Sequence, residues 1–144
     1  MDKPRLAYQF HKITQIGIPP KKEKTMKASI ESSVDTAVAY YQAMNRKDLA
    51  EMSRHLHPDI QLVSPLDSLT GRQAVLDAAQ RFLPAVKNID VRAQFGSEKQ
   101  AMLVYDMVFN EPLGVCRTAA LITFQGDLIV RNELFFDARP FERK

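Results

Sequence analysis

The histidines and the single cysteine of this protein are its first candidates for a metal ligand or a nucleophile. His55 and His57 stand two positions apart near the expected end of a helix, where they do not share a face. No third ligand follows in a suitable pattern, so we expect no metal and no other cofactor. Cys116 precedes Arg117, which could favour a thiolate, yet a single cysteine in a strand is more often a small apolar filler.

The positive charge of the chain is concentrated at its N-terminus. The formal net charge is +3, but residues 1–27 alone carry seven lysine or arginine and two acidic side chains, and the remainder is slightly acidic. This basic segment lacks the interleaved aromatic side chains of a stacking surface, so we expect no nucleic-acid partner. Residues 1–30 show no sustained period, which predicts a flexible extension before a single domain over residues 31–144.

No apolar run approaches the ~20 residues of a spanning helix, so we expect no membrane partner. The first 25 residues also lack the continuous apolar region of a secretory signal. A chain with one cysteine fits a reducing compartment, and the sequence therefore predicts a cytoplasmic protein.

Three amphipathic helices are expected in the first half of the domain. Ser32 with Asp35 is a variant of the capping box and predicts a first helix from about Ser32. The apolar stripe of this helix comprises Ala37, Tyr40, Tyr41 and Met44. Two further capping patterns predict the next helices. Asp48 with Glu51 starts a second helix, which Pro58 ends. Thr70 with Gln73 starts a third helix, which Pro84 ends or kinks.

The hydrophobic period changes from 3.6 to 2 at Ile89. Ile89, Val91, Ala93 and Phe95 alternate with polar residues, as in a half-buried strand. Short turns between later strands favour antiparallel pairing. We therefore predict an α+β domain whose helices cover one face of a curved, mainly antiparallel sheet, with strands over residues 60–64, 89–95, 101–109, 115–124 and 128–136.

Several short pieces, in this order and spacing, resemble a SnoaL-like domain of the nuclear-transport-factor-2-like superfamily. They are the first helix, the Asp48 helix start, the His57-Pro58-Asp59 corner, the Leu69-Thr70-Gly71-Arg72 segment and the strand Ile129–Asp137. The resemblance spans about residues 34 to 140. It implies a cystatin-like cone whose concave sheet face, closed by the first and third helices, forms a small-molecule pocket.

Ketosteroid isomerase, in the same superfamily, combines a carboxylate base with an oxyanion site of tyrosine and protonated aspartate. The resemblance places its tyrosine at Tyr40, but its two carboxylate positions fall on Ser64 and Ala120. We therefore expect no steroid isomerisation by that mechanism. Asp67 is the acid nearest the implied pocket mouth and could act as a displaced base, although aspartate beside Ser68 is typical of a turn, and we favour the turn.

Laying the strands on the family pattern predicts which residues face the pocket. The ligand-binding candidates are Tyr105, Met107, Thr118, Ala120, Asn132, Leu134 and Phe136, beside Tyr40 and Asp67 as catalytic candidates. The polar members could bind a ligand or, alternatively, pack in the core with hydrogen bonds to backbone. Asn132 stands out, because an amide on an apolar face needs a partner.

Two functions remain open at this point. One is an enzyme of isomerase, cyclase or hydrolase type acting on a small, mostly apolar molecule, with Tyr40 as donor and Asp67 as base. The other is a non-catalytic ligand-binding or dimerisation module. The outward row of the last strand, Ile129, Arg131, Glu133 and Phe135, with Ala119 and Leu121 beside it, is apolar enough to predict a homodimer through this face.

Overall fold

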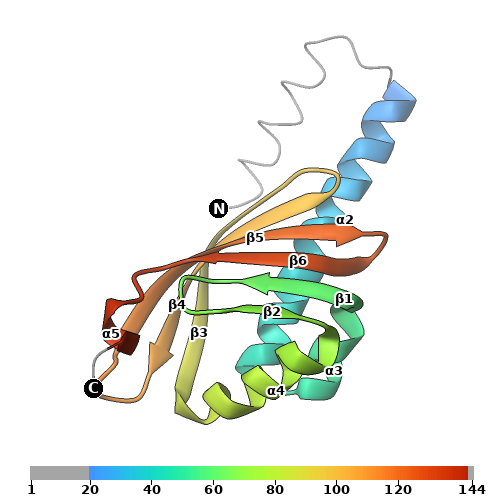
Figure 1. The fold of residues 1–144 in the computed structure, drawn as a ribbon. Helices are drawn as coiled ribbons and strands as arrows, with labels where there is room; N and C mark the ends of the chain where they lie inside the picture. Colours follow the sequence, from blue (N-terminus) through green and yellow to red (C-terminus); the bar gives the residue numbers. More distant parts are fainter. Residues whose placement is uncertain (1–19, 143–144) are drawn as a thin grey trace.

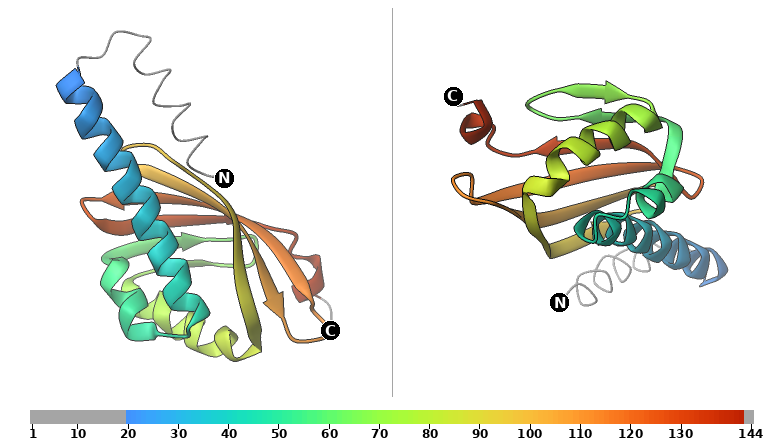
Figure 2. Two further views of the ribbon diagram at one scale, coloured as in Figure 1. Left: turned by 180° about the vertical axis from the view of Figure 1, so that it is seen from behind. Right: turned by 90° about the horizontal axis from the view of Figure 1, so that it is seen from below.

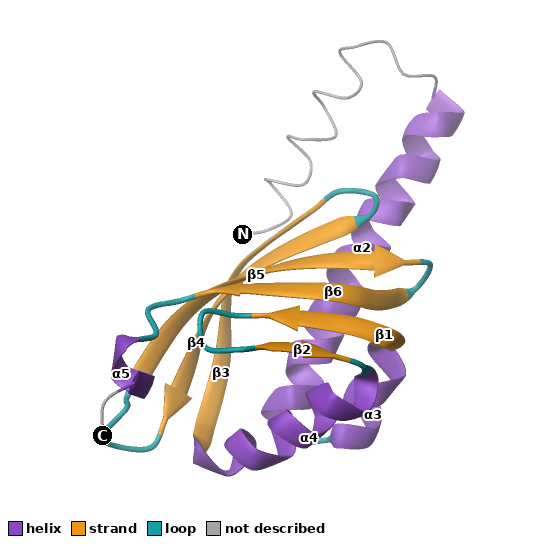
Figure 3. Cartoon of the chain, in the orientation of Figure 1, coloured by secondary structure: helices purple, strands orange, loops and turns teal. Residues whose placement is uncertain are grey.

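Helices and strands are segregated in this chain, with the longer helices on one side of a six-stranded sheet (Figures 1 and 3). The computed structural model describes residues 20–142. The α+β architecture predicted from the sequence is confirmed. The elements are α2 (Pro20–Asn45), α3 (Leu49–His55), β1 (Leu56–Val63), β2 (Ser68–Thr70), α4 (Arg72–Phe82), the 3₁₀ turn η1 (Leu83–Ala85), β3 (Val86–Gly96), β4 (Gln100–Phe109), β5 (Val115–Gln125), β6 (Leu128–Phe135) and α5 (Arg139–Glu142).

The strands follow the order β2-β1-β6-β5-β4-β3. Strands β3 to β6 form an antiparallel meander, whereas β1 lies parallel to β6. A parallel neighbour needs a long connection, which here is the whole chain from the β1–β2 turn to the β5–β6 turn. Helix α2 packs against β3 and β4, and α4 packs against β1 and β2. Figure 2 shows α2 lying across the sheet, so the helices leave the opposite sheet face uncovered.

The predicted start of the first helix near Ser32 is wrong, because the helix begins earlier and is longer than expected. Helix α2 begins at Pro20, and proline suits the first turn of a helix because it has no N–H to leave unpaired. Ile30 is buried, and it lies with Val34 against Gly96 of β3, where any Cβ would overlap Val34. Residues 1–19 of the predicted flexible extension lie outside the described residues, and its last part is helical.

The two other capping patterns had different outcomes. Asp48 caps α3 as predicted, because its side chain accepts a hydrogen bond from the Glu51 backbone N–H at 3.0 Å. The box of Thr70 with Gln73 is wrong: Thr70 ends β2, and Gly71, with φ 101°, occupies the N-cap of α4 without a side-chain bond. Pairing of β2 with β1 holds Thr70 in extended backbone, which excludes it from the cap.

Two β-bulges alter the predicted alternation. Arg92 is an extra residue in β3, so Ala93 and Phe95 pair with Val104 and Met102 and do not share the face of Ile89. Val130 is likewise extra in β6. The predicted outward position of Ile129 is therefore wrong, because Ile129 pairs with Phe124 and is fully buried in the core.

The outer face of the sheet carries a charged cluster. Asp106 of β4 is buried although it is ionisable. Its carboxylate accepts hydrogen bonds from Arg117 Nε at 2.8 Å, from Arg117 Nη2 at 3.1 Å and from Arg92 Nη1 at 3.3 Å. The bulge at Arg92 brings that guanidinium to Asp106, so both carboxylate oxygens are satisfied.

Among residues 20–142, no helix combines the length and the apolar content that crossing a bilayer requires.

Candidate functional site

A cavity of about 280 Å³ lies between α2, α4 and the inner face of the sheet. It is larger than the ~150 Å³ engineered cavity that holds benzene in another protein. Most of its wall is apolar. The α4 residues Val75, Ala78, Ala79 and Phe82 form one side, and the aromatic group of Phe109, Phe136 and Phe141 forms another.

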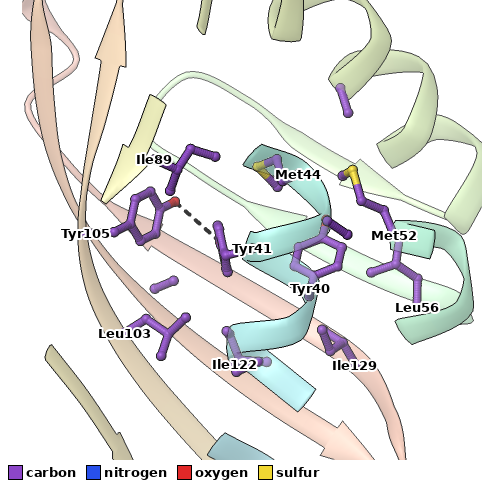
Figure 4. Close-up of a cluster of buried hydrophobic side chains, with 14 of the residues drawn as sticks. Tyr40, Tyr41, Met44, Met52, Leu56, Ile89, Leu103, Tyr105, Ile122 and Ile129 are labelled. Carbon is purple, nitrogen blue, oxygen red and sulfur yellow. Dashed lines mark hydrogen bonds between the residues drawn. The ribbon is translucent and has the colours of Figure 1, made fainter. Parts of the chain in front are cut away.

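Tyrosines from α2 and β4 form the polar part of the cavity wall. Tyr40 and Tyr41 are adjacent on the inward side of α2, and their rings meet edge to face with centroids 5.2 Å apart. The Tyr41 ring also packs on Tyr105 of β4, with centroids 4.6 Å apart (Figure 4). All three side chains are at least 98% buried. Close ring packing therefore fixes their hydroxyl groups in place.

The Tyr41 hydroxyl is the centre of a hydrogen-bonded group that we call the polar trio, comprising Tyr41, Tyr105 and Asn132. Tyr105 donates to the Tyr41 oxygen at 3.3 Å, the bond dashed in Figure 4. The Asn132 Nδ2 of β6 donates to the same oxygen at 3.0 Å. Asn132 Oδ1 is buried and has no partner among residues 20–142. The trio therefore joins α2, β4 and β6 with one acceptor unused.

Burial controls the ionisation of the cavity's tyrosines. It raises the pKa of Tyr40, to which the neighbouring Tyr41 adds, and it raises the pKa of Tyr105 well above its usual range. Burial also raises the pKa of Tyr41, opposed by the bonds from Asn132 and Tyr105. The phenols therefore stay protonated near neutral pH and act as hydrogen-bond donors.

Cys116 lies on β5 at the cavity wall, with its Sγ 3.7 Å from the Thr118 hydroxyl. Burial raises the pKa of the thiol, so Cys116 is not an activated thiolate. No group of three histidine, cysteine or acidic residues within the described part of the chain could hold a metal ion.

The turn between β1 and β2 borders the cavity. Ser64 Oγ accepts hydrogen bonds from the backbone N–H of Leu66 at 3.1 Å and of Asp67 at 3.2 Å, and donates to the Asp67 carbonyl. Asp67 Oδ1 accepts from the Ser68 N–H at 2.8 Å, so the side chain of Asp67 takes part in the turn, and a role as a base stays a prediction. Asp67 is exposed yet also lines the cavity.

Nearly all of the predicted site residues meet at this one cavity. Tyr40, Asp67, Tyr105, Met107, Thr118, Asn132, Leu134 and Phe136 line it. Ala120 does not: it is fully buried between Leu103 and Leu134, and its methyl group is too short to pass them. Whether these residues bind a ligand or take part in catalysis remains a prediction.

The prediction of site residues missed Tyr41, the centre of the polar trio. Its signal was present, since Tyr41 follows Tyr40 in a helical stripe wide enough for both to face inward. The α4 residues Val75, Ala79 and Phe82 also share one face in the sequence. Phe141 lies in no hydrophobic period of the sequence that would have predicted its place at the cavity. It reaches the wall through edge-to-face contacts with Phe109 and Phe136, at centroid distances of 5.4 and 5.7 Å.

Comparison with known proteins agrees with this geometry. The family model of the SnoaL-like domain matches residues 37–132. The chain belongs to the SnoaL-like domain family. The match runs from the inward stripe of α2 to Asn132, and so contains the whole polar trio.

Several solved structures share the fold of this SnoaL-like domain. A protein from Kribbella flavida described as of known function has 27% identity and a TM-score of 0.72, over 77% of this chain and 91% of that one. A putative ketosteroid isomerase from the same organism has 16% identity and a TM-score of 0.69, over 75% and 79%. A steroid delta-isomerase from Pseudomonas aeruginosa has 22% identity and a TM-score of 0.61, over 74% and 80%. No curated protein matches the chain.

Proposed function

We propose that this SnoaL-like domain binds a small, uncharged, mostly apolar molecule in its cavity. The observation that carries the proposal is the composition of the wall. Apolar side chains surround a few polar groups, of which only the Asp67 carboxylate carries charge, and none of the described residues that line the cavity is a lysine, arginine or histidine. Concave apolar sites with a few placed polar groups are typical of small-molecule binding.

Binding of naphthalene, measured by titration calorimetry, tests this proposal, because two fused rings are the next step up from benzene. Ala78→Leu adds volume inside the cavity and should abolish binding. Ala74→Leu makes the same change on α4 away from the cavity and should leave binding intact. Absence of naphthalene binding to the unmodified protein would refute the proposal. Native mass spectrometry of the purified protein can identify a ligand that it retains.

A catalytic role is the second candidate, since Tyr40 and Asp67 line the same cavity. A tyrosine can donate to a developing oxyanion, but abstraction of a proton from carbon also needs a base. Ser64 and Ala120 stand where the resemblance expects carboxylates, which leaves Asp67. We expect no measurable isomerisation of a Δ5-3-ketosteroid. Isomerisation that disappears in Asp67→Asn would instead assign the base to Asp67.

We also propose that two copies pair through the outer sheet face. Phe135 is 49% and Val115 is 61% exposed on that face, which none of the helices described within residues 20–142 covers. Phe135→Glu should yield monomers in sedimentation, because an unpaired charge in an interface core is strongly unfavourable. Leu66→Glu alters an equally exposed apolar residue beside the cavity and should leave the dimer intact. A monomeric parent protein at micromolar concentration would refute the pairing.

The chain's single cysteine fits a reducing compartment, and we propose a cytoplasmic location. Fluorescence microscopy of the tagged full chain tests this.

A further inference from the structure

The polar trio has hydrogen-bonding capacity that the protein itself does not use. Two phenols share one hydrogen bond, so one of their two O–H protons is left over. Asn132 Nδ2 donates to Tyr41. Asn132 Oδ1 has no partner among the described residues, although Asn132 is only 4% exposed. A buried polar atom without a partner costs stability, and such atoms are few in folded proteins.

The residues that carry the unused atoms belong to the cavity wall. Tyr41, Tyr105 and Asn132 all line the cavity, so a molecule held there can reach the trio. Tyr40 lines the same cavity, and its hydroxyl has no hydrogen bond within residues 20–142. The wall thus offers an acceptor at Asn132 and O–H donors at the tyrosines.

From this arrangement we infer that the ligand carries a neutral hydroxyl group, an alcohol or a phenol, which binds to Asn132 at the polar trio. A hydroxyl group both donates and accepts, so it can donate to Asn132 Oδ1 while accepting from a tyrosine.

Charged ligands fit this wall poorly. An anion would find no cationic partner among the described lining residues, and it would approach the Asp67 carboxylate. A buried unpaired charge is far costlier than a neutral polar group. A ligand whose only polar group is a carbonyl could accept from tyrosine but would leave Asn132 Oδ1 without a donor. The hydroxyl compound is thus the class that satisfies the whole trio.

This inference rests on the proposed binding function, and the test separates the two. The probes are naphthalene, 2-naphthol and 2-naphthoate, which share one ring system and differ in a single group. On the unmodified protein, 2-naphthol should bind about fivefold more tightly than naphthalene, the gain from one ordinary hydrogen bond. The carboxylate should bind more weakly than either.

Asn132→Leu should remove the preference for 2-naphthol while naphthalene still binds, because leucine keeps the branched shape but has no polar atoms. Asn88→Leu is the matched control, since Asn88 is exposed on β3 and does not line the cavity. It should keep the preference. If Asn132→Leu does not fold, two measurements on the unmodified protein still test the inference. They are the ratio of its affinities for 2-naphthol and naphthalene, and the ¹⁵N side-chain resonance of Asn132. Addition of 2-naphthol should shift that resonance, and naphthalene should not.

Equal binding of naphthalene and 2-naphthol would overturn the inference and leave the binding proposal standing. Tightest binding of 2-naphthoate would also overturn it. If Asn132→Leu still prefers 2-naphthol over naphthalene, the hydroxyl group binds outside the polar trio, and the inference is overturned. Absence of binding by all three probes would refute the binding function and this inference together.

Discussion

The two faces of the sheet hold their buried polar groups in opposite ways. On the outer face, both oxygens of Asp106 are satisfied by Arg117 and Arg92. On the inner face, Tyr41 receives bonds from Tyr105 and Asn132, but Asn132 Oδ1 has none within the described chain. The outer cluster carries charge and is complete, whereas the inner trio is uncharged and incomplete.

This difference separates a structural role from a binding role. A fully paired ion cluster ties β3, β4 and β5 together and leaves nothing for a ligand. An incomplete trio at a cavity wall reduces stability in the free protein, and a bound molecule can restore that loss. The comparison therefore predicts that substitutions on the two faces differ in what they change.

The largest effect on stability is expected from Tyr41→Phe. This change removes the oxygen that accepts from both Tyr105 and Asn132, and it leaves two buried donors without partners. We expect the free energy of unfolding to fall by about 1 to 3 kcal/mol, measured by urea denaturation. Tyr105→Phe is the control, since the Asn132 bond to Tyr41 persists and the loss should be smaller. Equal losses in the two variants would show that Tyr41 is not the centre of the trio.

A smaller, pH-dependent effect is expected from Asp106→Asn. Hydrogen bonding to Arg117 lowers the pKa of Asp106 against the opposing effect of burial. A carboxylate with a lowered folded pKa stabilises the protein above its unfolded pKa of about 4, and this contribution is lost as pH falls through the folded pKa. The stability advantage of the parent over Asp106→Asn should therefore be present near neutral pH and shrink below about pH 4.

Urea denaturation at several pH values measures this advantage. Asp127→Asn, in the exposed β5–β6 turn, is the control and should show no such pH dependence. A difference between the parent and Asp106→Asn that is the same at all pH values would mean that the ion cluster is not responsible.

Tyr40→Phe should affect binding more than folding. The Tyr40 hydroxyl has no hydrogen bond within residues 20–142, so its removal should leave the melting temperature of the free protein nearly unchanged. Binding of a ligand retained through purification should weaken by about 0.5 to 1.5 kcal/mol if the phenol makes one ordinary hydrogen bond. Calorimetry measures this loss. Unchanged affinity would remove Tyr40 from the site and support a core role alone.

A small effect on stability is also expected from Asn132→Leu. The variant loses the bond to Tyr41 but also removes the unpartnered Oδ1, so the free energy of unfolding should change by less than about 1 kcal/mol. Asn45→Leu provides the contrast, because Asn45 Oδ1 accepts from the Ile89 N–H at 2.8 Å and thus joins α2 to β3. That variant should be the less stable of the two. A large loss in Asn132→Leu would give the trio a structural role.

The sequence by itself determined the features that depend on near neighbours. Asp48 caps α3 through Glu51, three residues away, and α4 ends at Phe82 just before Pro84, because proline in the interior of a helix removes a hydrogen bond and clashes with the preceding turn. Helical and alternating periods predicted the α+β class, and the resemblance to a SnoaL-like domain supplied the inward direction of the strand residues. Where alternation is unbroken, as in Leu103, Tyr105 and Met107, each side chain lies on its predicted face.

Tertiary structure alone decided which of these residues meet and with what partners. Tyr41 and Asn132 are 91 residues apart, and their bond exists only because β6 lies where α2 crosses the sheet. The bulges at Arg92 and Val130 reversed the faces of Phe95 and Ile129, since one extra residue breaks the alternation between the two sides of the bulge. Such pairings follow from how distant segments close around one core, which a local pattern does not record.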